Sequence, residues 1–280
     1  MTQHEQKIQK QLAIPVHLLE ADPQQRPWSN LGDWSVARVY RNACCDLACR
    51  IGRAANLTPS DSILELACGH GASLNVWSEV FGVQAVDALE RQNTAIQSIE
   101  ADRPSALRRL WHMDVNTIFS GKRPWPMDEH YDALVVVDAA YHFHSLATFL
   151  EHSSLRLRAG GRIAFTTFLC GPAWSTAGLW QKALVLQLAQ KALIPAPSLL
   201  DEQTAAKAFG AAGFTAPVCV RLNQEVLGGF VQFVERRRRE LPWSDRMSRG
   251  WWKVEVTAAA ARQLLRTELL HYVLLNAVKV

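Results

Sequence analysis

The sequence predicts an α/β fold, a doubly wound and mostly parallel sheet of seven strands, and three observations support this prediction. Short apolar runs alternate with helical patterns from residue 62 to about residue 222. A turn with two glycines, Gly69 and Gly71, follows the first apolar run and leads into a helical pattern. An acidic residue lies at or near the end of each of the first four expected strands: Glu65, Asp87, Asp114 and Asp138. Ligands of such sheets bind beyond the carboxyl ends of the strands, so these acids are expected to gather at one site.

Strand and helix boundaries follow from hydrophobic periodicity and from glycine and proline punctuation. The expected strands are 62–67, 83–87, 110–113, 131–137, 162–168, 217–222 and 271–279, and the expected helices are 33–55, 70–80, 91–102, 145–158, 201–211, 228–240 and 255–268. The run 131–137 is apolar almost throughout, which is typical of a parallel strand covered on both faces. Residues 1–55 are expected to form an N-terminal arm and a helical cap. Residues 56–280 are expected to form the ligand-binding catalytic domain, with insertions of about 170–200 and 223–260 that cover its site.

Composition excludes several classes of partner. The chain has 280 residues and a net charge of +4 without a basic stripe interleaved with aromatics, so no nucleic-acid partner is expected. No apolar run approaches the roughly 18–20 residues of a membrane span, and the N-terminus lacks the apolar segment of a secretory signal. The six cysteines show no C-x-x-C spacing, which favours reduced thiols and a cytoplasmic location. The run Arg236–Arg239 favours a solvated helix face, with an anionic substrate or carrier surface as the alternative.

The glycine turn indicates a nucleotide-like cofactor. A turn without side-chain bulk lets a ligand lie against bare backbone, at the positive end of the following helix. Asp87 lies 16 residues after Gly71, where a carboxylate can accept hydrogen bonds from both hydroxyls of a ribose. Asp114 is placed to accept a hydrogen bond from an adenine amino group. For both aspartates the alternative is a turn or helix-cap role.

The order and spacing of these motifs resemble the class I S-adenosylmethionine-dependent methyltransferases, in the group that modifies small molecules such as ubiquinone, sterols and natural products. The matching stretches are 65–71, where Ala67 replaces the family's first glycine, 86–87, 113–114, 157–162, 211–214 and the terminal strand. The resemblance covers roughly residues 55–280. It implies a Rossmann-like methyltransferase fold and S-adenosylmethionine as the cofactor. It further implies methyl transfer to a carbon, oxygen or nitrogen of a small, largely apolar or aromatic metabolite.

The same resemblance implies a set of site residues. The cofactor is expected to contact Glu65, Ala67, Gly69, Gly71, Asp87, Ala88, Asp114, Val115 and Asp138. Residues 28–34 resemble the segment that covers the cofactor in small-molecule methyltransferases. The acceptor is expected to contact Trp28, Trp34, His144 and Trp174.

His142 and Tyr141 are the candidate catalytic residues. The enzyme's main task is to align the acceptor with the methyl group and to exclude water, and a base is needed only when the acceptor must lose a proton. His142 is the first candidate base because histidine titrates near neutral pH. Its alternative is a structural histidine bonded to the backbone. No metal is expected, because residues 166–168 read Thr-Thr-Phe where a metal-dependent enzyme of the catechol type would want an Asp-Asn pair.

Three other functions are weighed against this one. A lipid-modifying enzyme that resembles the cyclopropane synthases is a second hypothesis within the methyltransferases. The Glu-x-x-Glu-His pattern that such enzymes usually have after the fourth strand is missing here. A nicotinamide-dependent oxidoreductase would want a third glycine three residues after Gly71, where Leu74 stands. A non-catalytic binding module has no physical reason to keep the acids and glycines of the site. The expected partner is a small molecule, and a homodimer is one oligomeric state that the sequence allows.

Overall fold

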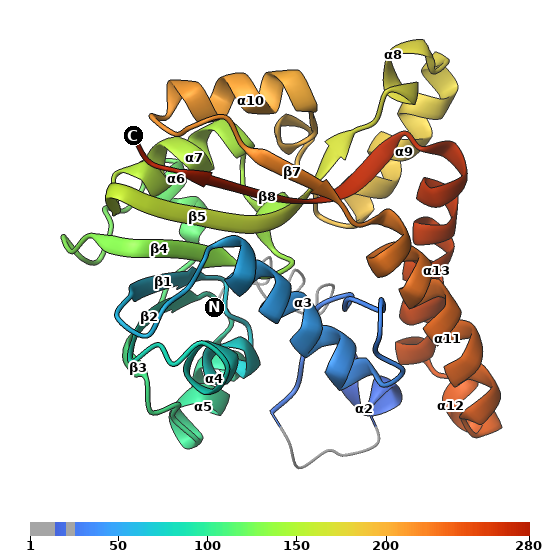
Figure 1. Ribbon diagram of the computed structural model, residues 1–280. Coiled ribbons are helices and arrows are strands. Elements are labelled where there is room, and N and C mark those ends of the chain that lie inside the picture. The colour runs from blue at the N-terminus through green and yellow to red at the C-terminus, as the bar shows by residue number, and fades with distance from the viewer. Residues whose placement is uncertain (1–14, 21–25) are drawn as a thin grey trace.

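A computed structural model describes residues 15–20 and 26–280, and its centre is one mixed sheet (Figure 1). The strands are β1 (Ser62–Leu66), β2 (Ala85–Glu90), β3 (Leu107–His112), β4 (Tyr131–Val136), β5 (Leu157–Cys170), β6 (Leu200–Asp201), β7 (Val218–Arg221) and β8 (Leu270–Val278). Their order is β3-β2-β1-β4-β5-β8-β7, and the two-residue β6 pairs with β5 outside this path. Strand β8 runs antiparallel to both β5 and β7, and the other pairings are parallel. The predicted doubly wound, mostly parallel sheet is therefore confirmed, with β6 added to the seven expected strands.

Helices cover both faces of the sheet and one of its ends (Figure 1). One face carries α3 (Tyr40–Ala54), α4 (Ala72–Glu79) and α5 (Asn93–Ala101), and the other carries α6 (Val115–Phe119), α7 (Leu146–Ser154) and α10 (Glu202–Ala211). The remaining helices are α2 (Val16–Leu19), α8 (Ala173–Thr176), α9 (Leu179–Lys191), α11 (Gly229–Glu240), α12 (Trp243–Arg246) and α13 (Arg249–Thr267). Of these, α9, α11 and α13 lie toward the ends of β4 and β5 and cover that side of the molecule.

Each face of the sheet has its own hydrophobic core. Trp77 of α4 and Ile51 of α3 are fully buried in the first core. Phe149 of α7 and Phe209 of α10 are fully buried in the second core. Both faces of the parallel strands are covered, and in sheets of this kind a ligand binds beyond the carboxyl ends of the strands.

Two boundaries differ from the sequence-based expectation in ways that affect the site. Strand β2 continues to Glu90 instead of ending at residue 87, because Leu89 pairs with Leu66 of β1 and Glu90 pairs with His112 of β3. Helix α3 begins at Tyr40 instead of residue 33. Residues 34–36 form a turn instead, and the Asp33 carboxylate before it accepts hydrogen bonds from Ser35 and pairs with Arg50 at 2.5 Å.

Other elements differ in their bounds as well, among them β5 and α13. Strand β5 starts at Leu157 rather than residue 162, and α13 starts at Arg249 rather than residue 255. The cause in α13 is Ser248, whose side chain accepts a hydrogen bond from Trp251 N and caps the helix six residues earlier.

Most of the expected N-terminal arm lies outside the described residues, because residues 1–14 and 21–25 are not among them.

Candidate active site

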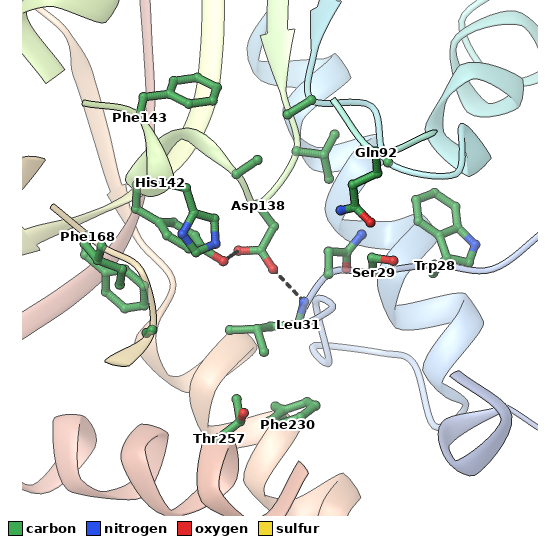
Figure 2. A pocket seen from close by; sticks show the side chains of 18 of the residues that line it. Trp28, Ser29, Leu31, Gln92, Asp138, His142, Phe143, Phe168, Phe230 and Thr257 are labelled. Atoms are coloured by element: carbon green, nitrogen blue, oxygen red, sulfur yellow. Dashed lines mark hydrogen bonds between the residues drawn. The ribbon is translucent and has the colours of Figure 1, made fainter. Parts of the chain in front are cut away.

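A cavity of about 610 Å³ lies beyond the carboxyl ends of β1, β2, β3 and β4. Its walls combine the glycine turn and the ends of these strands with residues 27–31 and with side chains of α9 and α13. Figure 2 shows Asp138 near its centre, with Trp28, Ser29 and Gln92 on one side and His142 and Phe168 on the other. The strand ends are polar, whereas α9, α11 and α13, here called the cover helices, line the cavity with mostly apolar side chains. The cavity therefore has two chemically different ends.

The glycine turn forms the wall at the polar end. Ala67, Gly69 and Gly71 all have left-handed φ angles, of 56°, 57° and 78°. A Cβ added to Gly69 would meet nothing within 4 Å, and Gly69 lines the cavity, so its backbone is open to a ligand. Gly71 instead packs against the protein, because an added Cβ would lie 2.8 Å from Ile99 and 3.0 Å from Arg26. Gly71 is thus required by the turn and by packing, and the expectation that it backs onto the cofactor is corrected.

Glu65 is fully buried beneath this turn and lines the cavity. Its two carboxylate oxygens accept hydrogen bonds from Ser73 Oγ and Trp77 Nε1, each at 2.6 Å. Burial raises the pKa of Glu65 to about 7, against the lowering effect of these two hydrogen bonds, and the nearby Glu90 raises it further. The polar end of the cavity therefore holds two neighbouring buried carboxyl groups.

Glu90 is the acid at the carboxyl end of β2. Its Oε2 accepts a hydrogen bond from Gly69 N at 2.8 Å, and its Oε1 accepts hydrogen bonds from Arg91 N and Gln92 N at 2.8 Å each. The residue is only 3% exposed and lines the cavity, and burial raises its pKa. Glu90 thereby joins the glycine turn to the end of β2 and presents its carboxylate at the cavity wall.

Asp87 does not reach the cavity, which corrects the sequence-based expectation of a ribose contact. It lies in the middle of β2, fully buried, and is not among the lining residues. Its carboxylate pairs with Arg108 at 2.9 Å and with Arg109 at 3.0 Å, and it accepts a hydrogen bond from the Tyr131 hydroxyl at 2.8 Å. Residues three apart in a strand face opposite sides of the sheet, so Asp87 and Glu90 cannot serve the same site.

The remaining expected cofactor residues divide between the cavity and the core. Ala67, Asp114, Val115 and Asp138 line the cavity, whereas Ala88 is fully buried in the core and does not. Asp114 caps α6, because its Oδ1 accepts a hydrogen bond from Asn116 N at 2.9 Å, and it pairs with Arg91 at 3.3 Å. The helix-cap alternative for Asp114 is therefore observed, in a residue that also faces the cavity.

Asp138 joins three separate parts of the chain in the middle of the cavity wall. It accepts hydrogen bonds from Leu31 N at 2.7 Å, from Tyr141 at 3.0 Å and from Tyr272 of β8 at 2.6 Å. Burial raises its pKa to about 6, against the lowering effect of these donors, and its φ of 51° is left-handed. Its contact with Leu31, drawn in Figure 2, holds the N-terminal segment against the end of β4. This side chain acts as a structural clamp for the cavity.

His142 lines the cavity and lies against Tyr141, with ring centroids 4.4 Å apart. Its Nδ1 lies 3.1 Å from the carbonyl oxygen of Leu193. Since a carbonyl only accepts hydrogen bonds, this contact places the ring proton on Nδ1 and leaves Nε2 as the acceptor. Burial lowers the pKa of His142 to about 4, so the ring is neutral at neutral pH. The Tyr141 hydroxyl donates its hydrogen bond to the Asp138 carboxylate, so toward a ligand it can act only as an acceptor.

Only one of the four expected acceptor contacts lines the cavity. Trp28 does, and it is 5% exposed. Trp34 instead stacks on Phe233 with ring centroids 4.6 Å apart, and Trp174 lies beneath Lys182 outside the cavity. His144 is exposed and is not a lining residue. These three expectations are corrected, because an aromatic residue in a flanking segment carries no sequence signal for which way its ring points.

Sequence reasoning missed Glu90 and most of the apolar wall. The side chains of the apolar wall come from the cover helices and the loops beside them and include Val185, Leu188, Ile194, Phe230, Val254 and Leu264. The two insertions were expected to cover the site, and they do line the cavity. Which of their side chains face inward depends on helix packing that the sequence pattern does not specify.

Comparison with known proteins identifies the family. Residues 36–217, more than half of the chain, match the model of a family described as a methyltransferase domain. No curated protein sequence shows significant similarity to the chain.

Solved structures with the same fold cover nearly all of the chain. The cyclopropane synthase MmaA2 from Mycobacterium tuberculosis has a TM-score of 0.75 at 16% identity, over 100% of this chain and 99% of that chain. A geranyl diphosphate C-methyltransferase from Streptomyces coelicolor A3(2) has a TM-score of 0.63 at 16% identity, over 86% and 82% of the two chains. The cyclase SpnF has a TM-score of 0.68 at 15% identity, over 98% and 96%. At these identities the likeness shows the fold.

The family match overturns the nicotinamide-dependent oxidoreductase as an alternative. It agrees with the cavity at the carboxyl ends of the strands, where the glycine turn and the buried acids lie. The chain belongs to the methyltransferase domain family and has the fold of the class I S-adenosylmethionine-dependent methyltransferases.

Proposed function

We propose that the protein transfers the methyl group of S-adenosylmethionine to a carbon, oxygen or nitrogen of a small, largely apolar or aromatic metabolite. One observation carries this proposal. A single cavity joins a polar end, with the glycine turn and two buried carboxyl groups, to an apolar end that contains a neutral histidine. The first end suits a nucleoside cofactor and the second end suits the acceptor.

The polar end fits the cofactor in shape and in charge. The open backbone at Gly69 leaves room for a ligand against the turn. We assign the ribose contact to Glu90 instead of Asp87, because Glu90 is the acid at the cavity wall. The buried Trp28 Nε1 and His70 Nδ1 have no hydrogen-bond partner among the described residues, and both residues line the cavity. They offer polar partners to a bound ligand.

Two buried carboxyl groups near each other also favour a cation. Burial raises the pKa of both Glu65 and Glu90, Glu90 raises that of Glu65 further, and a positively charged ligand nearby would stabilise the ionised carboxylates. S-adenosylmethionine, when bound, supplies an electrophilic methyl group on a positively charged sulfonium. The charge of the polar end therefore matches the charge of this cofactor.

The apolar end holds and orients the acceptor. Phe168, Phe230 and Leu264 supply an apolar wall that excludes water, and alignment with water exclusion accounts for most of the rate in a displacement of this kind. We propose that His142 Nε2 accepts the proton when the acceptor is a hydroxyl or an activated carbon. Tyr141 then positions the acceptor, because its own proton is held by Asp138.

A cyclopropane synthase-like reaction on a lipid is the second candidate. The apolar lining of the cavity suits an alkyl chain as well as an aromatic ring. The two candidates differ in the acceptor and share the cofactor and the polar end of the site. For either one we propose a role in biosynthesis in the cytoplasm, for which the six free thiols are suited.

Incubation of the protein with isotopically labelled S-adenosylmethionine and a metabolite extract tests the proposal directly. Mass spectrometry should find a labelled product heavier than its precursor by one methyl group in place of hydrogen, together with S-adenosylhomocysteine. A protein that binds the cofactor in calorimetry and yields no labelled product from polar and apolar extracts would contradict a methyltransferase function.

The affinity for S-adenosylmethionine should depend on pH through Glu65. Because its pKa is raised to about 7, the group is largely protonated at pH 6 and largely ionised at pH 8. A cation binds better to the ionised form, so affinity should fall by several-fold to about tenfold from pH 8 to pH 6. Calorimetry at both values measures this, and binding at pH 7 should release protons to the buffer. The Glu65→Gln variant should lose the pH dependence, and an unchanged slope in that variant would assign it to another group.

A further inference from the structure

Helix α9 lies on the surface and exposes four large apolar side chains, beside the exposed polar residues Gln181, Gln187, Gln190 and Lys191. Val185 and Ala189 face inward, with exposed fractions of 2% and 5%. The outward residues Leu179, Trp180, Leu184 and Leu186 are 85%, 90%, 48% and 38% exposed. Large apolar side chains that gather on an exposed face with polar residues around them mark an interaction site. The outward face of α9 is therefore suited to a partner surface.

The charged side chains of α9 itself are all basic. Residues 171–200 contain two lysines, Lys182 and Lys191, and no aspartate or glutamate. On the same side of the molecule (Figure 1), α12 and α13 add the exposed side chains of Trp243 and Trp252, at 75% and 64%. Helices α9, α11, α12 and α13 together contain eleven lysines and arginines and four acids. This excess of seven positive charges exceeds the net charge of +4 for the whole chain.

We propose that α9 docks this protein onto an anionic lipid surface. Exposed tryptophan and leucine with flanking lysine form the side-chain set that lies in a membrane interface. A second copy of the chain is a poorer occupant, because a symmetric contact through α9 would bring the Lys182 side chains of both copies together, and α9 itself contains no acid. None of the described helices is long and apolar enough to cross a bilayer.

The inward face of the same helix lines the cavity through Val185, Leu188 and Ala189. One helix thus forms both the lipid contact and part of the apolar wall. If the proposed function holds, this arrangement implies that the acceptor is an apolar molecule dissolved in or carried by the lipid surface. This part of the inference rests on the proposed function. The docking itself does not depend on the proposed function.

Flotation of the full chain with vesicles tests the proposal without cofactor or acceptor. Vesicles of phosphatidylcholine with phosphatidylglycerol should bind the protein, and vesicles of phosphatidylcholine alone should bind it at least tenfold more weakly. The Trp180→Ser/Leu184→Gln double variant should lower the partition coefficient more than tenfold, because two exposed apolar side chains that the lipid buries are removed. The Lys182→Gln variant should lower it about fivefold at low salt.

The matched control is Val80→Gln/Leu155→Gln, two apolar residues outside the cover helices that are 53% and 52% exposed. It should bind vesicles as the parent does, and thermal unfolding should show that all variants are folded. Three results would overturn the proposal: no binding to anionic vesicles, equal binding to both vesicle types, or a double variant that binds like the parent. Self-association that the double variant abolishes would make a second copy the occupant. Calorimetry with S-adenosylmethionine measures cofactor binding independently. A protein that binds the cofactor but no vesicles would contradict the lipid docking and leave the proposed function in place.

Discussion

Replacing Glu90 by glutamine should weaken S-adenosylmethionine binding by about tenfold to a hundredfold. The carboxylate at the end of β2 accepts three backbone hydrogen bonds, one of which holds the glycine turn at Gly69. Glutamine keeps the size of the side chain, removes the charge and turns one acceptor into a donor. Hydrogen bonds to a charged group are worth roughly 1.5–3 kcal/mol each, which gives the expected loss. Titration calorimetry with S-adenosylmethionine measures it.

Asp87→Asn is the matched control, since it removes the same charge from the same strand. Its carboxylate serves Arg108, Arg109 and Tyr131 away from the cavity. The variant should therefore bind S-adenosylmethionine as the parent does, and its free energy of unfolding in urea should fall by about 1–3 kcal/mol. A loss of affinity in Asp87→Asn with none in Glu90→Gln would reverse our assignment of the ribose contact.

His142→Ala should lower kcat about a hundredfold if the acceptor gives up a proton during methyl transfer. The Nδ1 contact to Leu193 directs Nε2 to act as the acceptor, and alanine removes it. Turnover at saturating S-adenosylmethionine measures the effect on kcat apart from cofactor binding. His144→Ala is the control, because that residue lies in the same loop, is exposed and does not line the cavity. A loss below about fivefold in His142→Ala would leave His142 with the structural role that its backbone contact already gives it.

The pH profile of kcat gives a second, independent readout for His142. A general base works in its neutral form, so the rate falls when the pH drops through its pKa. Burial lowers that pKa to about 4, and kcat should therefore stay level from pH 8 to about pH 5 and decline only below it. A decline centred near 6.5, the ordinary histidine value, would point to a solvated group instead.

The pKa shifts at the polar and apolar ends of the cavity should affect different kinetic parameters. In the proposed function Glu65, whose pKa burial raises to about 7, acts in cofactor binding, and His142, whose pKa burial lowers to about 4, acts in the step after binding. Acidification from pH 8 to pH 6 should therefore raise the KM for S-adenosylmethionine before it affects kcat. Measurement of both parameters over this range separates the two groups.

Much of the fold was predictable from the sequence alone. The glycine turn after the first apolar run, the alternation of strands and helices and the motifs of the resemblance are local patterns. These patterns were enough to predict the sheet, the family and the end of the sheet that holds the cavity. Glu65, Ala67, Gly69, Asp114, Val115, Asp138 and His142 were all expected in the site and all line the cavity. They could be predicted because the backbone of a turn or a strand end leaves few directions for the residues that follow it.

The tertiary structure decided which acid faces the cavity, which tryptophans line it and what the cover helices expose. Asp87 and Glu90 are three residues apart, and the end of β2 is set by pairing with β1 and β3, which are distant in the sequence. The directions of Trp34 and Trp174 depend on contacts with Phe233 and Lys182 from other segments. An isolated pattern gives the period of an element, while the direction in which its side chains point depends on the elements packed around it. The apolar outer face of α9 became visible for the same reason, since only the packed fold shows which side of that helix is left uncovered.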